Sequence, residues 1–395
     1  MSMITLLNVI NVLDKKRKLV LIIAGEASAD EHGSNLVRAM KNLDSGIDFW
    51  GIGGKKMAEA GVKTLVSSSE MAVVGLTEVL SRFHRITTAF IKLKNILKNH
   101  SPHLLILIDY PEFNLSLARI AKRYKVPVLY YISPQIWAWR KGRIKKITRR
   151  VDRMAVILPF EESFYRRYGL SVEYVGHPVL DNLPSEIDKS QITRELGLQG
   201  RHPILGLLPG SRNEEVKNLL PPMIRAAENL SLRYDKIKGI LPLASTISPD
   251  LINSIIRQSS VDIKIFQGNI YDALALCDLA VVASGTATLE TAIMGVPMII
   301  VYKVSPITFH VAKVAVKVPY IGLVNLVAGK KVVPELIQNN VTPQRIADEA
   351  LAILEDSRNK ENLIKGLRIV KERLGRGGAS ERTARIAIDM IRTRP

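Results

Sequence analysis

The chain has almost no cysteine, because Cys277 is the single one among its 395 residues. One thiol can form neither a disulfide within the chain nor a thiolate metal site, so the sequence is typical of a reducing cytoplasm. Long apolar runs are also missing, and none reaches the ~20 residues that a membrane-spanning helix needs. Acidic residues are outnumbered, with 37 Asp and Glu against 56 Lys and Arg, a formal net charge of +19. This charge favours phosphorylated substrates, an anionic membrane surface or nucleic acid as partners.

Several recognition signatures are absent as well. The sequence has no helix-turn-helix, RNA-recognition motif or zinc-finger spacing, so nucleic acid is not an expected partner. The dinucleotide fingerprint G-x-G-x-x-G does not occur in the turns after the first strand of either half, which argues against NAD or FAD. We therefore expect no cofactor and no bound metal.

Apolar strands alternate with amphipathic helices twice along the chain. A length of 395 residues suits two domains, and 47% apolar residues support sizeable cores. The alternation predicts an α/β fold with a doubly wound parallel sheet in each half. Two Rossmann-like domains facing a central cleft are the GT-B architecture. Strands are expected at 19–24, 49–52, 104–108, 128–132 and 154–158, and again at 204–208, 238–241, 262–266, 278–283 and 298–302.

The expected boundaries follow from this doubling. Residues 1–18 are an N-terminal extension, whose apolar start precedes basic residues in the reverse order of a secretory signal. The first domain spans 19–180 and the second 181–375. From 342 onward the chain is predicted to be helical with a break at 375–378, and helix 376–395 is expected to pack back on the first domain.

The stretch 281–303 predicts a buried strand, a turn, a helix, a turn and another strand. Its turn, Ser284-Gly285-Thr286, would leave backbone N–H groups free at a helix N-terminus beside the carboxyl end of a parallel strand. The amides and the helix dipole would favour a diphosphate, and Glu290 could accept ribose hydroxyls. The alternative is that Thr286 or Thr288 merely caps the helix and that Glu290 favours its N-terminus electrostatically.

Arg212 stands in Leu-Pro-Gly-Ser-Arg, at the first turn of the second half. A guanidinium fixed there would neutralise a leaving diphosphate. The alternative is a surface arginine paired with Glu214 or Glu215.

Asp109 follows five apolar residues and stands at the carboxyl end of their strand. Partial desolvation would raise its pKa toward the working range of a general base, and Glu112 competes for that role. The alternative is a carboxylate that caps the next turn.

At the first strand's end, Gly25-Glu26-Ala27-Ser28 offers small residues that let a sugar or phosphate approach the backbone closely, and Glu26 could accept sugar hydroxyls. The alternative there is a helix-entry loop capped by Asp30.

Two further features lie in the first half. Trp137 and Trp139 precede a basic helix predicted over 140–150, and they suit either a stacking platform beside an anion site or buried packing. His177, in Val-Gly-His-Pro, is either structural or a catalytic candidate at the junction of the domains.

The order of these motifs resembles the lipid A disaccharide synthase family. Each motif alone is weak, but they are collinear over nearly the whole chain. They are Ala-Gly-Glu-Ala-Ser at 24–28, Gly-Ile-Gly-Gly at 51–54, Ile-Asp-Tyr-Pro-Glu-Phe-Asn at 108–114, Tyr-Tyr-Ile-Ser-Pro-Gln-Ile-Trp-Ala-Trp at 130–139, Leu-Pro-Phe-Glu at 158–161, Val-Gly-His-Pro at 175–178, Leu-Pro-Gly-Ser-Arg at 208–212, Ala-Ser-Gly-Thr-Ala-Thr-Leu-Glu at 283–290, Pro-Glu-Leu-Ile-Gln at 334–338 and Ala-Ser-Glu-Arg at 379–382.

The resemblance implies an inverting GT-B hexosyltransferase. Its donor would be UDP-2,3-diacylglucosamine and its acceptor 2,3-diacylglucosamine 1-phosphate, giving a β-1,6-linked disaccharide 1-phosphate and UDP. The alternative is another GT-B enzyme acting on a UDP-sugar, either a lipid-carrier glycosyltransferase or a hydrolysing epimerase. The resemblance implies functional roles for Glu26, Asp109, Arg212, Glu290 and Asn325. The expected site residues are, in all, Asp109, Glu26 and His177 for catalysis, and Arg212, Ser211, Ser284, Gly285, Thr286, Ala287, Thr288, Glu290, Asn325 and Gln338 for the donor.

Acylated substrates imply a cytoplasmic enzyme held peripherally on the anionic inner leaflet of the inner membrane, and the resemblance allows a homodimer. Contacts to acceptor or membrane are expected from Ser28, Trp137, Arg140, Met71, Val74, Leu76, Arg82 and Arg85. The chain departs from the family at Ala29, where glycine is usual, at Glu112, where aspartate is usual, and at Gly322-Leu-Val-Asn325, where Ser-Leu-Pro-Asn is usual. The last difference weakens the expected donor contact at Asn325, and the methyl of Ala29 is expected to crowd a close approach.

Overall fold

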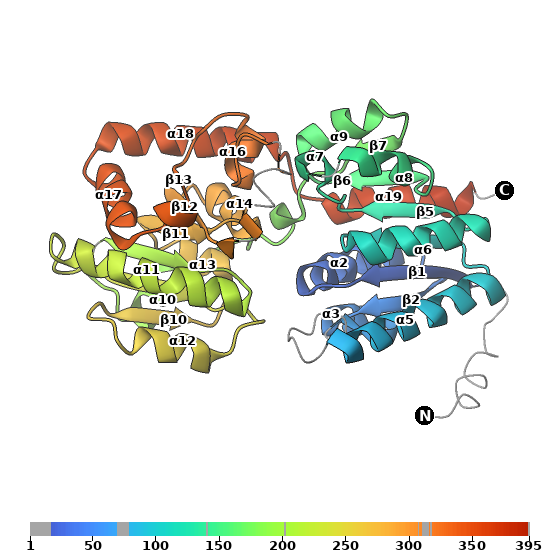
Figure 1. Cartoon of the computed structure of the whole chain (residues 1–395), viewed down its shortest axis with the longest axis horizontal. Helices are drawn as coiled ribbons and strands as arrows, with labels where there is room; N and C mark the ends of the chain where they lie inside the picture. The colour runs from blue at the N-terminus through green and yellow to red at the C-terminus, as the bar shows by residue number, and fades with distance from the viewer. Residues whose placement is uncertain are drawn as a thin grey trace. The chain divides into compact units, whose positions relative to one another are not determined.

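The computed structural model describes residues 17–68, 79–139, 141–200, 203–306, 308, 309, 316 and 318–393. The chain divides into two compact units, Met1–Pro178 with Gly378–Pro395, and Val179–Gly377. Each unit has its own parallel sheet with helices on both faces (Figure 1). The expectation of two Rossmann-like α/β units is thereby confirmed.

The first unit is built on a seven-stranded sheet of order β3-β2-β1-β4-β5-β6-β7. The central strands β1 and β4 are almost entirely buried, which explains their uninterrupted apolar sequences. All neighbouring strands are parallel. The strands are β1 Lys18–Ala24, β2 Ile47–Gly53, β3 Val62–Ser67, β4 Leu104–Ile108, β5 Val128–Tyr131, β6 Arg153–Val156 and β7 Ser171–Tyr174.

Helices that cover this sheet begin where the sequence supplies start signals. Pro111 and Pro159 occupy the first turn of α6 and α9, where proline's missing N–H costs no hydrogen bond. The helices are α2 Ala27–Leu43, α3 Lys55–Glu59, α5 Val79–Asn99, α6 Pro111–Arg123, α7 Ile136–Trp139, α8 Ile144–Thr148, α9 Pro159–Arg166 and α19 Ala379–Arg392, with 3-10 turns η2 Lys141–Arg143 and η3 Pro178–Leu180.

The C-terminal helix α19 belongs to the first unit although the second unit precedes it in sequence. It packs against α2, and Figure 1 shows this red helix among blue and green elements. Arg382 donates from Nε to the Val175 carbonyl at 2.8 Å, and Arg153 pairs with Asp389 at 2.5 Å.

The second unit repeats the arrangement with a six-stranded parallel sheet of order β10-β9-β8-β11-β12-β13. Its strands are β8 Ile204–Leu208, β9 Lys238–Pro242, β10 Ile263–Phe266, β11 Leu279–Ala283, β12 Met298–Tyr302 and β13 Glu335–Ile337. Its helices are α10 Lys189–Glu195, α11 Asn213–Ser231, α12 Pro249–Ile256, α13 Ile270–Leu274, α14 Thr286–Ile293, α16 Leu323–Ala328, α17 Pro343–Leu354 and α18 Ser357–Arg373, with the 3-10 turn η4 Gln338–Asn340.

The sequence patterns missed several short elements, namely β3, β7, β13, α10 and α16. The single helix expected over 140–150 is wrong, because this stretch forms the 3-10 turn η2, which contains Gly142, a poor helix former, and then the short helix α8. The C-terminal helical stretch also has an extra break at Asp356. This side chain caps α18 by accepting from the amides of Arg358 at 2.9 Å and Asn359 at 3.0 Å.

Within the described part of the chain, no helix combines the length and apolar character needed to cross a bilayer.

Candidate active site

Both sheets reverse their strand order at one place, between β1 and β4 in the first unit and between β8 and β11 in the second. Open α/β sheets bind ligands at such switch points, beyond the carboxyl ends of the strands. The register pairs Ala24 with Ile108, so the turn holding Glu26 lies beside the turn holding Asp109. In the second unit Val282 pairs with Leu208, so the turn before Arg212 lies beside Ser284-Gly285. The four turns predicted to carry chemistry therefore form two adjacent pairs.

Asp109 directly follows β4 and is partly buried. Its backbone is left-handed, with φ 47°, and so is that of Tyr110, with φ 44°. Glu112 differs, because its side chain is 71% exposed and forms an ion pair with Arg143. Partial burial suits a general base better than full solvation, so the geometry favours Asp109 over Glu112 for that role.

The turn after β1 places Glu26 at the N-cap of α2, partly exposed, with Ser28 exposed beside it. Asp30 does act as a cap, but for a different helix. Its carboxylate accepts from the amides of Gly54 at 2.6 Å and of Lys56 and Met57 at 3.1 Å each, so it anchors α3. Ala29 is 2% exposed, so the expectation that its methyl crowds a ligand is wrong.

Trp137 is 6% exposed, and its ring packs edge-on against Phe160 with centroids 4.8 Å apart. The prediction of a stacking platform at Trp137 is therefore wrong, because a buried ring offers no open face. Its indole N–H donates to Glu161 at 2.9 Å. Trp137 instead helps to fix the loop that follows β5.

Glu161 is a residue whose role the sequence analysis missed. Its carboxylate is 1% exposed and accepts from Ser133 Oγ at 2.6 Å and from the amides of Leu158 at 3.0 Å and Ile157 at 3.3 Å, besides Trp137. Burial raises the pKa of Glu161, while these donors oppose that rise. Its motif, Leu-Pro-Phe-Glu, was visible, but nothing in the sequence shows that the glutamate points inward.

His177 is 3% exposed, and burial, with a smaller contribution from the charge of His32, lowers its pKa to about 3. The imidazole is neutral near pH 7, and so low a pKa makes it a weak base. This geometry favours the structural alternative for His177.

In the second unit, α14 begins at Thr286 with Gly285 as its N-cap, a residue without a side chain that could cap the helix. The expectation that Thr286 or Thr288 caps the helix is wrong, because the Thr288 hydroxyl donates to the Gly285 carbonyl at 2.7 Å. A Cβ added to Gly285 would meet no atom within 4 Å. The N-terminus of α14 therefore opens onto free space on this side. Ala287 lies in its first turn, and Glu290 is partly exposed one turn further on.

Arg212 has a 71% exposed side chain and pairs with Glu215 at 3.4 Å, as the surface alternative expected. Glu215 also accepts from the Ser211 amide at 3.1 Å. An exposed pair of this kind is worth about 0.2–1 kcal/mol, so a diphosphate could displace Glu215 from the guanidinium.

Buried Asn325 and partly buried Glu335 form a hydrogen-bond network in the second unit. Asn325 is 0% exposed; its Nδ2 donates to Glu335 at 2.8 Å and to the Val333 carbonyl at 2.9 Å, while its Oδ1 accepts from the amides of Val332 and Val333. Glu335 accepts from the amides of Ile321 and Gly322 at 3.0 Å each. Asn325 thus braces a loop and does not itself present its amide to solvent.

This loop is connected to the predicted diphosphate site. Ser284 Oγ donates to the Ile321 carbonyl at 3.1 Å, so the braced loop holds the turn before α14. Gln338 has a similar bracing role, since its amide donates to the Val304 carbonyl at 2.9 Å and accepts from the Val304 amide at 2.7 Å.

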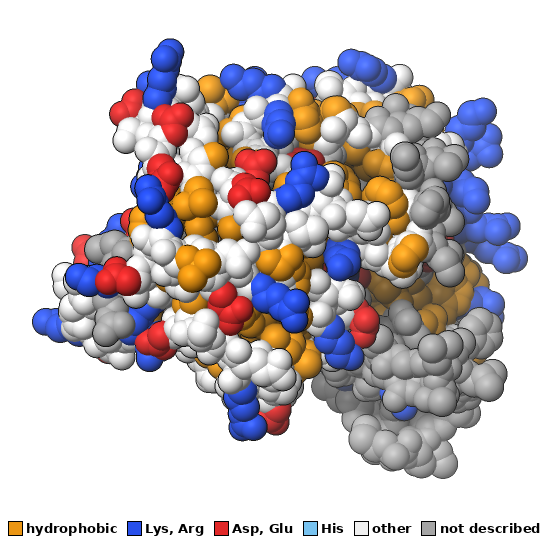
Figure 2. All heavy atoms as spheres, turned by 60° about the vertical axis from the view of Figure 1, so that its left-hand side comes forward, with side chains coloured by type: hydrophobic (Ala, Val, Ile, Leu, Met, Phe, Trp, Pro, Cys, Tyr) orange, Lys and Arg blue, Asp and Glu red, His pale blue; other side chains and the backbone are white. Residues whose placement is uncertain are grey.

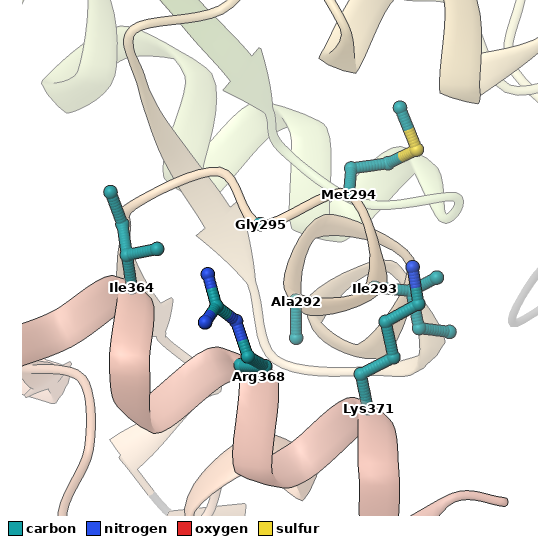
Figure 3. A pocket seen from close by; sticks show the side chains of 7 residues that line it. All are labelled: Ala292, Ile293, Met294, Gly295, Ile364, Arg368 and Lys371. Carbon is teal, nitrogen blue, oxygen red and sulfur yellow. The ribbon is translucent and has the colours of Figure 1, made fainter.

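The opposite end of α14 borders a cavity of about 210 Å³, shown in Figure 3. Arg368 and Lys371 reach toward it from α18, where cations complement the carbonyls at a helix C-terminus. It does not coincide with the predicted site. In the described residues, no group of three or more His, Cys, Asp or Glu side chains could hold a metal ion.

The excess positive charge is concentrated in the first unit. Its sequence holds 32 of the 56 Lys and Arg but 17 of the 37 Asp and Glu, and 32 − 17 leaves +15 of the total +19. Figure 2, which turns the other unit toward the viewer, shows side chains of both signs interspersed there. The predicted contacts Met71, Val74, Leu76 and Arg140 lie outside the described residues, as does the side chain of Arg82.

Comparison with known proteins gives the family. A family model described as lipid-A-disaccharide synthetase matches residues 20–387. The chain belongs to the lipid-A-disaccharide synthase family. A relative from Geobacter sulfurreducens is 49% identical over 372 residues, covering 94% of this chain and 97% of the relative. Another, from Myxococcus xanthus, is 42% identical over 372 residues with the same coverage. Family membership makes the chain a glycosyltransferase.

Solved structures agree in fold. A UDP-GlcNAc 2-epimerase from Neisseria meningitidis bound to UDP-GlcNAc has a TM-score of 0.63 at 12% identity, covering 94% of this chain and 100% of its own. The calicheamicin glycosyltransferase CalG4 has a TM-score of 0.59 at 14% identity, covering 96% and 100%. At such identities these likenesses show the GT-B fold alone.

Proposed function

We propose that this chain transfers 2,3-diacylglucosamine from UDP-2,3-diacylglucosamine to 2,3-diacylglucosamine 1-phosphate. The products are a β-1,6-linked disaccharide 1-phosphate and UDP. The observation that carries the proposal is the family match, which spans both units and includes the turns at both switch points. This match favours the synthase over the alternative of an epimerase or a lipid-carrier transferase, whose likeness to this chain rests on fold.

UDP is assigned to the second unit. The glycine N-cap of α14 and the open space at Gly285 support a diphosphate at this turn, since the amides and helix dipole carry partial positive charge. Glu290, one turn into α14, would accept the ribose hydroxyls. Asn325 and Gln338 act on this site through the loops that they brace.

The reaction is a single displacement at the anomeric carbon. The acceptor's 6-hydroxyl attacks from the face opposite the diphosphate, Asp109 takes its proton, and the bond to UDP breaks. Negative charge grows on the leaving diphosphate, where Arg212 and the amides at the start of α14 would stabilise it. One such donor is commonly worth about 2.7–4 kcal/mol in the transition state. Glu26, beside Asp109, would hold sugar hydroxyls.

Binding to an anionic membrane surface is assigned to exposed basic residues of the first unit. These residues lie on α5, α6 and α8: Arg85, Lys92, Lys94, Lys98, Arg119, Lys122, Arg123, Lys145 and Lys146. Helix α5 contacts α6, and Arg150, which follows α8, donates to the Leu115 carbonyl of α6 at 3.0 Å. Each charge near an anionic leaflet is worth about 1 kcal/mol. Equal binding to vesicles with and without anionic lipid, in low salt, would remove this part of the proposal.

The decisive experiment mixes the protein with both acylated substrates and detects products by mass. We expect equimolar UDP and disaccharide 1-phosphate, with turnover unaffected by chelator. UDP release without disaccharide would instead support a hydrolase or epimerase. Asp109→Asn keeps the size of the side chain but removes the base, so turnover should fall while UDP affinity stays the same. A near-normal rate for this variant would reassign the base.

A further inference from the structure

Strained backbone gathers at the carboxyl edge of the first sheet. Asp109 and Tyr110 are consecutive left-handed residues after β4, and Ile132, after β5, has φ 63°. A left-handed conformation is costly for residues other than glycine, most of all for a β-branched one. Such residues persist where the surrounding structure holds them, and they cluster at functional sites.

Two buried side chains hold the turn at Asp109. The Asp109 carbonyl accepts from the Tyr130 hydroxyl at 2.6 Å and from Asn114 Nδ2 at 2.7 Å. Asn114 Nδ2 also donates to the Ile108 carbonyl, at 3.2 Å. Both side chains are 0% exposed. The carbonyl of a single strained residue therefore receives two side-chain donors from different elements, α6 and β5.

Both side chains act at this turn as hydrogen-bond donors. Asn114 Oδ1 is buried and has no hydrogen-bond partner within the described residues, so the side-chain hydrogen bonds that anchor this amide are those that its nitrogen donates. Burial, and then the charge of Asp109, raise the pKa of Tyr130 well above its ordinary value, so the hydroxyl remains a donor at any working pH.

A third contact ties this turn to its neighbour. A Cβ on Gly25 would lie 2.7 Å from the Tyr110 ring, so the ring lies directly over the glycine backbone. The ring of Tyr110 therefore packs the strained turn against the turn that carries Glu26.

We propose that Asn114 and Tyr130 are positioning residues, which hold the carbonyl of Asp109 so that its strained backbone fixes the direction of the carboxylate. This inference rests on the proposed role of Asp109 as the base. A relaxed turn would let the carboxylate move and take up more solvent, without changing the donor site in the other unit.

The test compares Tyr130→Phe and Asn114→Ala with the control Tyr165→Phe. Tyr165 is equally buried, and its hydroxyl donates to the Pro134 carbonyl at 2.8 Å, in a turn that does not hold Asp109. For each variant, kcat, the acceptor KM, the pH profile of kcat and the Kd for UDP are measured. We expect Tyr130→Phe to lower kcat at least tenfold and to shift the acidic limb to lower pH, with the Kd for UDP unchanged. Tyr165→Phe should leave the acidic limb in place.

The outcomes separate this inference from the proposed function. If Asp109→Asn abolishes turnover but Tyr130→Phe keeps both kcat and the acidic limb, the positioning role is overturned and the function stands. If Tyr165→Phe shifts the limb as far as Tyr130→Phe, general loosening explains the effect and the positioning role is again overturned. If Asp109→Asn retains its rate, the assignment of the base itself fails. Should Asn114→Ala not fold, Tyr130→Phe decides alone.

Discussion

Because the imidazole of His177 is buried, we expect the stability of the folded chain to depend on pH by an amount that can be calculated. The pKa of this imidazole is about 3 in the folded chain, against an ordinary value of about 6.5. Between these values the unfolded chain binds a proton that the folded chain does not, so stability rises with pH across this window and falls as the pH drops below 6.5. The imidazole is therefore expected to be neutral throughout the working range of the enzyme.

The magnitude follows from the linkage relation. Each pH unit below the ordinary pKa lowers the free energy of unfolding by about 1.36 kcal/mol, and pH 5 lies about 1.5 units below that pKa. The wild type should therefore lose about 2 kcal/mol between pH 7.5 and pH 5 through this group alone. His177→Gln removes the titration, so the variant should lose about 2 kcal/mol less over the same range, whatever its stability at pH 7.5.

The assay is denaturant unfolding at several pH values, followed by tryptophan fluorescence. All three tryptophans, Trp50, Trp137 and Trp139, belong to the unit that contains His177, so the signal reports on that unit. Equal losses in the wild type and the variant would refute the reasoning. The variant should also keep the acidic limb of the kcat profile, because a buried imidazole with so low a pKa is too weak a base to be the group that the limb reports.

Three other predictions concern the second unit. Gly285→Ala should change the free energy of unfolding by less than about 0.5 kcal/mol, since a Cβ there meets no atom. It should nevertheless raise the Kd for UDP, because the methyl fills the space before α14. Calorimetry measures both quantities. Asn325→Ala should cost at least about 3 kcal/mol in denaturant unfolding and should weaken UDP binding, because it leaves the buried carbonyl and amide of Val333 unpaired. Cys277 is partly exposed, but desolvation raises its pKa to about 12, so the thiol should react more slowly with alkylating reagents in the folded chain than after unfolding, as mass spectrometry would show.

The sequence alone determined the architecture. Continuous apolar strands such as 104–108 and 204–208 can only be buried on both faces, and helices between them make such strands parallel. The turn at 284–286 and the position of Asp109 after its strand were equally visible, because local residue types define them. Short elements such as β13 and α10 escaped, since their few residues carry too little periodicity.

Tertiary structure decided what the polar side chains do. Trp137, Glu161, His177 and Asn325 all lie in segments whose patterns allow either an exposed or a buried side chain. Whether each is buried depends on residues that are distant in sequence, as the bond from Asn325 to Glu335 and the clamp of Tyr130 on Asp109 show. The hydrogen-bond partner of a side chain is set by packing, which a one-dimensional pattern does not encode.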